Sequence, residues 1–224
     1  MNKLVFDIET LGFPFESFDE KQQEYLMKFS KTDEERVETL QKLALTPFTG
    51  HIIAIGMLNP DSHHGKVWFE SDKPDSFTSE DGMIEFVSGT EQQMLEGFWE
   101  TLSHFDQFIT FNGRSFDCPY LMLRSAILGV KPTRNLFPYR YSHSEHCDLL
   151  EQLTFYSVFR KFNLDFYCKS FGITSPKAGG ITGLDLKPLY DAGRFREIAE
   201  YCIGDVQATA ELYSHWFNFL AFEK

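Results

Sequence analysis

Hydrophobic and polar residues alternate differently in successive parts of the chain. Three apolar runs rich in β-branched and aromatic residues predict strands at Lys3–Ile8, His51–Leu58 and Lys66–Glu70. The polar stretch between the first two, about residues 13–47, has good helix formers and apolar residues at helical spacing. We interpret it as a mostly helical insertion after the first strand.

The rest of the chain mixes helical spacing with two further short strands. Helices are predicted at Glu91–Phe105, Asp117–Leu128, Asn163–Phe171, Leu184–Asp191 and Phe195–Phe219. Strands are predicted at Gln107–Asn112 and around His146–Leu150, and a loop at Ser71–Gly82. Strands that alternate with helices indicate an α/β fold.

Length and composition fit one domain. The chain has 224 residues, of which 42% are hydrophobic and 24 are Phe, enough for a sizeable core. A membrane-spanning helix needs about 18 or more apolar residues in a row, and none is present. The N-terminus reads as a strand rather than a signal peptide, so we expect a cytoplasmic protein with reduced cysteines.

The net charge of -12 limits the class of partner. A wide duplex-binding surface is normally basic, so the charge argues against one. A small pocket that binds only the end of a nucleic-acid strand needs fewer phosphate contacts. Such a pocket is compatible with the negative net charge. Lys177 is one candidate phosphate contact, with a solvated loop lysine as the equal alternative.

The first candidate motif is Phe-Asp-Ile-Glu-Thr, at the end of the first strand. Asp7 and Glu9 are two residues apart, so their side chains point to the same face of the sheet. Two carboxylates so close repel each other unless a cation lies between them. The alternative is an ordinary solvated polar face.

The second motif, Phe-Asn-Gly-Arg-Ser-Phe-Asp-Cys-Pro-Tyr-Leu, spans a turn from a strand into a helix. Asp117 lies at the start of that helix, where an N-cap is the ordinary reason for an Asp. Asn112, Arg114 and Ser115 occupy the turn, where phosphate or sugar oxygens are often bound.

The third motif is Tyr-Cys-Ile-Gly-Asp, in the last predicted helix. Tyr201 and Asp205 are four residues apart and share one face of that helix. The alternative is an ordinary amphipathic helix with a half-buried Tyr and an exposed Asp, which would give the same sequence pattern. Taken together, the three motifs supply four carboxylates, which could hold two divalent cations, and a Tyr that could orient water.

These motifs resemble those of a known family. FDIET, FNGRSFDCPYL and YCIGDVQAT are similar to the three exonuclease motifs of DEDD 3′→5′ exonucleases, in the DnaQ-like group of the ribonuclease H-like superfamily. The Tyr in the third motif is typical of the DEDDy branch. Most of the chain resembles the stand-alone bacterial predicted exonucleases related to the proofreading domain of family B DNA polymerases.

The resemblance implies a fold and a metal site. The fold is a mixed five-stranded sheet flanked by helices, formed by residues 1–224 as one exonuclease domain. Two divalent cations, Mg²⁺ or Mn²⁺, are implied as cofactors. Asp7, Glu9 and Asp205 would bind the cation on the nucleophile side, Asp7 would bridge to the second, and Asp117 would hold the second. Tyr201 completes the catalytic set.

The resemblance also implies a substrate. The enzyme would remove nucleoside 5′-monophosphates from 3′ ends of DNA, mainly single-stranded, or of RNA. Thr10 and Leu11 would meet the terminal nucleotide, and Asn112 and Phe116 would line the path of the strand. The insertion is a departure from the minimal domain.

Two other functions compete with this interpretation. The chain could be a nucleic-acid-binding module that keeps the fold with weak catalysis, or an acidic interaction protein whose motifs arise by chance. The complete set of five motif residues favours the exonuclease. The sequence distinguishes neither DNA from RNA nor single from double strands, and it identifies no protein partner, oligomeric state or pathway.

Overall fold

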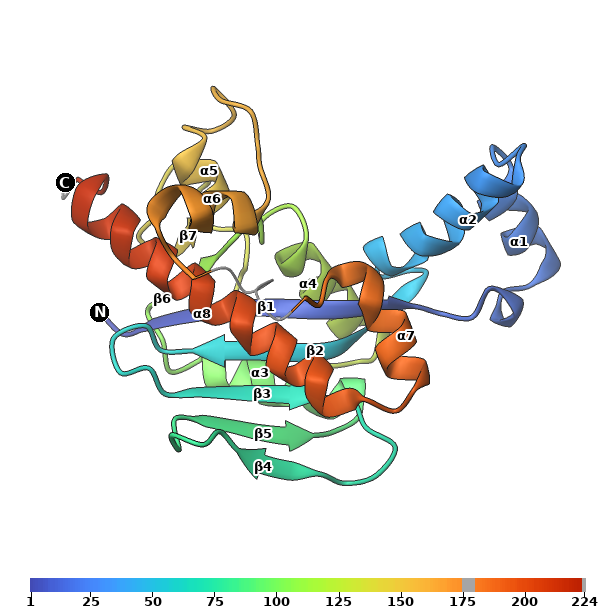
Figure 1. Cartoon of the computed structure of the whole chain (residues 1–224), viewed down its shortest axis with the longest axis horizontal. Coiled ribbons are helices and arrows are strands. Elements are labelled where there is room, and N and C mark those ends of the chain that lie inside the picture. The colour runs from blue at the N-terminus through green and yellow to red at the C-terminus, as the bar shows by residue number, and fades with distance from the viewer. Residues whose placement is uncertain (175–179, 223–224) are drawn as a thin grey trace.

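A computed structural model describes residues 1–174 and 180–222, and it is built around one mixed sheet (Figure 1). Seven strands lie in the order β4-β5-β3-β2-β1-β6-β7. Their bounds are Lys3–Gly12 for β1, Gly50–Leu58 for β2, Gly65–Phe69 for β3, Ser76–Thr78 for β4, Ile84–Ser88 for β5, Gln107–Thr110 for β6 and His146–Asp148 for β7.

The motif strand β1 is internal to this sheet. It pairs antiparallel with β2 on one side and parallel with β6 on the other. A register shift interrupts the pairing with β2 between Glu9 and Thr10. Both carboxylates of the first motif therefore precede the irregularity, and the alternation that places them on one face holds.

Helices cover both faces of the sheet (Figure 1). Their bounds are Glu20–Met27 for α1, Asp33–Lys42 for α2, Glu91–Leu102 for α3, Asp117–Ile127 for α4, Leu149–Leu153 for α5, Leu164–Phe171 for α6, Leu186–Asp191 for α7 and Phe195–Phe219 for α8. The long helix α8 crosses one face over β1 and β2, and α3 and α4 pack on the other. Within the described residues, no helix has the length and apolarity to span a membrane.

Each face of the sheet contributes to its own hydrophobic cluster. Val5, Ile53 and Val206 belong to the cluster under α8, whereas Phe6 and Trp99 belong to the cluster under α3 and α4. Successive residues of β1 enter opposite clusters, as a strand with two covered faces requires. The first strand is thus buried on both sides except at Asp7 and at its two end residues.

The predicted α/β fold with a mixed sheet and flanking helices is confirmed, with seven strands rather than five. The additional strands are β4 and β5, and β4 falls inside the predicted loop at Ser71–Gly82. β4 has three residues, too few to show a two-residue period, and β5 has five. They extend the sheet at its β3 edge, away from the motif strands.

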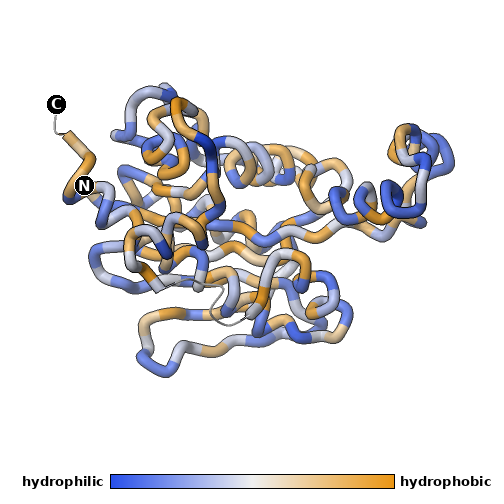
Figure 2. Tube along the Cα trace, turned by 45° about the horizontal axis from the view of Figure 1, so that its top comes forward, coloured by the Kyte–Doolittle hydropathy of each residue, from blue (hydrophilic) through white to orange (hydrophobic). Residues whose placement is uncertain are grey.

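Residues 13–47, which we call the arm, project from the end of β1 (Figure 1). α1 and α2 form most of it, and neither contains a buried residue. Capping boxes at Asp19 and Thr32 satisfy the first backbone N–H groups of both helices. Figure 2 shows the arm as mostly hydrophilic with isolated hydrophobic residues, so local capping rather than a core of its own stabilises these helices.

Candidate active site

Asp7 and Glu9 lie on the face of β1 that α8 covers. Carboxylate oxygens of both residues and the Sγ of Cys202, on α8, lie within 4.8 Å of one another. The partner of Asp7 on β2 is Gly56, where an added Cβ would lie 2.9 Å from Val206 Cγ2 on α8. Gly56 therefore allows the helix to approach the sheet closely beside the first motif.

The second motif reaches the first through a hydrogen bond. Asp117 is the first residue of α4, and its Oδ1 accepts from the backbone N–H of Ile8 at 3.1 Å. Ile8 stands between the two carboxylates of the first motif, and the Asp117 side chain is almost fully buried. The side chain thus binds the motif strand from the first residue of α4.

The third motif lies on α8 and faces the same space. The negative charge of Asp205 raises the pKa of both Asp7 and Glu9, so its carboxylate is close to theirs. The hydroxyl of Tyr201 forms a hydrogen bond with Asp205. Residues from β1, α4 and α8 therefore bring all five motif side chains together.

Burial and mutual repulsion dominate the electrostatics of this cluster. Burial is the largest cause that raises the pKa of Asp7, followed by the charges of Asp117, Glu9 and Asp205. Burial likewise raises the pKa of Glu9, with Asp205 and Asp117 adding to it. Burial raises the pKa of Asp117 to about 7, against the hydrogen bonds that its carboxylate accepts from its own backbone N–H and from that of Ile8. Such a crowded set of hard oxygen donors suits divalent cations.

Cys202 is a neighbour of the cluster that the sequence analysis missed. Its thiol donates to the backbone carbonyl of Asp7 at 3.8 Å. Burial, followed by the charges of Glu9 and Asp7, raises the pKa of this thiol far above its usual range, so it stays protonated. Because Mg²⁺ and Mn²⁺ prefer oxygen ligands, we assign Cys202 to packing between α8 and β1.

The residues expected to contact substrate are partly engaged within the protein. Thr10 donates from its hydroxyl to Ala44 in the arm at 2.9 Å, and Leu11 is buried in the core under α8. Asn112 adopts a left-handed backbone conformation with φ 63°, and Phe116 packs against Tyr120. Substrate contacts by these four side chains stay a prediction.

Asp148 organises the turn of the second motif. Its carboxylate accepts from the backbone N–H groups of Asn112 at 3.1 Å and Arg114 at 2.9 Å, and it caps α5. The guanidinium of Arg114 lies beside Glu151, with Nε 3.4 Å from Oε2. The turn is therefore held by a neighbouring strand, and the Arg114 side chain is already paired. Lys177 lies outside the described residues.

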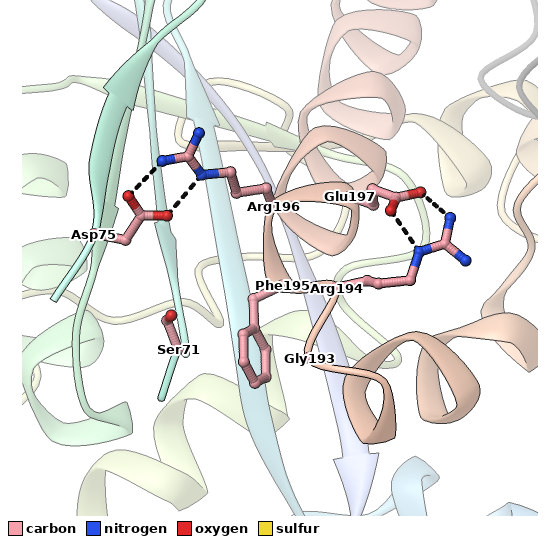
Figure 3. Close-up of a pocket in the computed structure, with 7 residues that line it drawn as sticks. All are labelled: Ser71, Asp75, Gly193, Arg194, Phe195, Arg196 and Glu197. Atoms are coloured by element: carbon pink, nitrogen blue, oxygen red, sulfur yellow. Dashed lines mark hydrogen bonds and ion pairs between the residues drawn. The ribbon is translucent and has the colours of Figure 1, made fainter. Parts of the chain in front are cut away.

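A separate pocket lies at the start of α8 (Figure 3). It has a volume of about 300 Å³. Two of the residues that line it, Arg194 and Arg196, form bidentate ion pairs with Glu197 and Asp75. Since both guanidinium groups are paired and none of the motif carboxylates lines the pocket, the carboxylate cluster is the candidate active site.

Comparison with known proteins assigns the family. A family described as "Predicted 3'-5' exonuclease related to the exonuclease domain of PolB" matches residues 51–221. The chain belongs to this family. The match includes the second and third motifs, and the first motif lies before it. No match is found among curated proteins.

The fold of this PolB-related family member is similar to a solved polymerase structure. The family B DNA polymerase of the hyperthermophilic archaeon Pyrobaculum calidifontis superposes with a TM-score of 0.61 and 18% sequence identity. The similarity covers 98% of this chain and 25% of the polymerase chain. It therefore includes the motif strand β1, which the family match does not reach.

Replacing one clustered carboxylate should stabilise the metal-free protein. Because the folded pKa of Asp117 is raised to about 7, its contribution to stability is present at low pH and is lost as pH rises toward and past 7. Asp117→Asn keeps an acceptor for Ile8 and removes the charge. In EDTA at pH 8 we expect its melting temperature to rise by about 4–8 °C, or roughly 2 kcal/mol.

The gain should shrink at pH 5, where the wild-type carboxyl is protonated, and saturating Mg²⁺ should stabilise the wild type more than the variant. Thermal melts at both pH values check this. An Asp117→Asn protein that melts below the wild type in EDTA at pH 8 would contradict mutual repulsion as the dominant force.

Proposed function

We propose that the chain is a metal-dependent 3′→5′ exonuclease of the DEDDy type. Asp7, Glu9, Asp117 and Asp205 are its metal-binding carboxylates, and Tyr201 completes the catalytic set. The observation that carries the proposal is the convergence of carboxylates from β1, α4 and α8 whose charges raise one another's pKa. Membership in the PolB-related exonuclease family supports it.

The donor set fits two divalent cations, Mg²⁺ or Mn²⁺. Four carboxylates in a buried cluster carry an excess of negative charge that bound cations would neutralise. Asp7, Glu9 and Asp205 would hold one cation, while Asp7 and Asp117 would hold the other. Two bound cations supply activation of the attacking water and charge stabilisation at the leaving 3′-oxygen.

Tyr201 is suited to orienting water rather than to taking its proton. Burial, followed by the charges of Glu9, Asp205 and Asp7, raises the pKa of its hydroxyl well above the usual value. The hydroxyl is therefore protonated at neutral pH and engaged with Asp205. A neutral hydroxyl that donates to Asp205 can still accept a hydrogen bond from a water molecule beside the carboxylates.

The proposed substrate is the 3′ end of single-stranded DNA, with RNA as the variant, and the products are nucleoside 5′-monophosphates. The net charge of -12 supports a site that holds a strand end rather than a long duplex. We further propose that residues 1–224 form one exonuclease domain in which the arm is an insertion. A cytoplasmic location stays a prediction.

Digestion of a 5′-labelled single strand tests this function. With Mn²⁺ or Mg²⁺, we expect a ladder that shortens from the 3′ end and disappears in EDTA. RNA of the same sequence measures the sugar preference, because 2′-hydroxyl contacts decide it. Intact DNA and RNA with either cation would instead favour a binding module that keeps the fold.

Tyr201→Phe should cause a moderate loss of activity. The variant removes one hydrogen bond to the reacting water while the carboxylates remain, so we expect digestion to slow by about 10- to 100-fold. Tyr213→Phe is the matched control, since Tyr213 lies on the same helix but bonds Gln107 instead. Single-turnover rates measure both variants, and a loss as large as that of Asp7→Asn would exclude a purely orienting role.

A further inference from the structure

Three tyrosines form a connected set of rings outside the carboxylate cluster. The ring of Tyr141 lies 5.8 Å from that of Tyr139 and 4.8 Å from that of Tyr156, between centroids. Tyr139 is 73% exposed and Tyr141 is 57% exposed. We call these three residues the tyrosine platform. A contiguous exposed apolar patch often marks a binding site.

The tyrosine platform is linked to the turn that precedes Asp117. Arg140 stands between Tyr139 and Tyr141 in the sequence. Its Nη2 forms an ion pair with the buried carboxylate of Glu151, 2.5 Å from Oε1. The same carboxylate lies beside Arg114, in the turn of the second motif. The platform therefore lies on the side of the molecule where α4 and Asp117 begin.

The backbone that presents Tyr156 is strained. Phe155, Tyr156 and Ser157 follow one another in the left-handed region, with φ of 49°, 58° and 76°. Hydrogen bonds hold them there, from the N–H of Tyr156 to the carbonyl of Glu151 and from the N–H of Ser157 to Thr154 Oγ1. Non-glycine residues rarely adopt this conformation, and such strain is typical of ligand-binding segments.

Cations follow the platform along the chain. Arg160 and Lys161 come four and five residues after Tyr156, and both are exposed. The guanidinium of Arg160 lies over the ring of Phe162, 5.2 Å from its centroid. Neither cation forms an ion pair with any residue in the described ranges 1–174 and 180–222. Exposed aromatic rings followed in sequence by cations without an ion pair match the chemistry of single-stranded nucleic acid.

We propose that the tyrosine platform stacks bases of a single strand upstream of the nucleotide held at the carboxylate cluster. Bases paired in a duplex offer no free faces to such rings, so the platform favours single strands. The inference rests on the proposed function, because it assigns a path to the same substrate. With a net charge of -12, the chain must obtain its affinity from stacking more than from phosphate contacts.

Fluorescence anisotropy with Ca²⁺ in place of Mg²⁺ tests the platform. The probes are a labelled trinucleotide, which the proposal confines to the carboxylate cluster, and a strand of about 12 nucleotides, within the site sizes of single-strand-binding domains. The test variant is Tyr139→Ala/Tyr141→Ala, and Tyr139→Phe/Tyr141→Phe keeps the rings. Tyr25→Ala/Phe29→Ala is the matched control, because these arm residues are 75% and 80% exposed.

For the long strand, we expect the alanine variant to bind about 10- to 100-fold more weakly, as the loss of two stacking rings predicts. The phenylalanine variant and the arm control should stay within about threefold of the wild type. Affinity should fall only slightly as the salt concentration rises. A plot of log K against log [salt] should have a slope of magnitude below about 2. An alanine variant that binds like the wild type, or an equal loss for both probes, would overturn the platform.

Mn²⁺-dependent digestion by the wild type is measured in parallel. If the wild type digests nothing but the alanine variant loses affinity for the long strand, the proposed function fails and the platform stands. If the wild type digests the strand and the alanine variant keeps its affinity, the platform fails and the proposed function stands.

Discussion

Asp7→Asn is expected to abolish exonuclease activity, with a loss of about a thousandfold or more in single-turnover rate. Asp7 lies in the middle of the cluster, where the charges of Asp117, Glu9 and Asp205 all act on it. Bound cations stabilise the transition state of phosphate hydrolysis by several kcal/mol, which corresponds to about three powers of ten. The amide keeps the size of the side chain and removes the charge that would bind them.

Asp61→Asn provides the control for this variant. Asp61 forms an exposed ion pair with Lys3 and lies in the turn between β2 and β3, so its loss should leave digestion within about twofold. Isothermal titration with Mn²⁺ should show weaker binding in Asp7→Asn alone. Unchanged digestion by a folded Asp7→Asn protein would remove the carboxylate cluster from the mechanism.

Much of the fold could be predicted from hydrophobic periodicity. Long elements with a clear period, such as α3 at Glu91–Leu102 and α8 at Phe195–Phe219, occur within a few residues of their predicted positions. β5 escaped prediction although β3, of the same length, was predicted, because its place in the sheet depends on parallel pairing with β3, which no local pattern encodes. The strand predicted around His146–Leu150 ends at Asp148 in the structure. The Asp148 side chain caps α5, so the chain turns into a helix after it.

The candidate site was predictable where its residues are close in sequence. Spacings of two on a strand and four on a helix place Asp7 with Glu9 and Tyr201 with Asp205. The contact between Asp117 and Ile8 joins residues more than a hundred positions apart, and no local pattern encodes it. Cys202 was missed because its contact with Asp7 also joins residues far apart in sequence. That contact depends on how closely α8 packs on Gly56.

The base of the arm depends on one buried ion pair. Arg124 on α4 donates from Nε and Nη2 to both carboxylate oxygens of Glu91 on α3, at 2.8 and 2.6 Å. Its Nη1 donates to the carbonyl of Pro47, where the arm returns to the sheet, at 3.1 Å. Glu91 also accepts from the backbone N–H of Ile52 at 2.9 Å. One side-chain pair thus joins two helices, the motif-flanking strand β2 and the arm.

Arg124→Met should therefore be among the most destabilising single substitutions, at about 3–5 kcal/mol, because it leaves a buried carboxylate unpaired. Urea unfolding measures the loss. Glu91→Gln/Arg124→Met should recover part of it, since the amide keeps an acceptor for Ile52 without a buried charge. Arg36→Met, which breaks an exposed pair with Asp33, should cost under about 0.5 kcal/mol. If the double variant were no more stable than Arg124→Met, the lost hydrogen bond to the carbonyl of Pro47 rather than the unpaired charge of Glu91 would account for the cost.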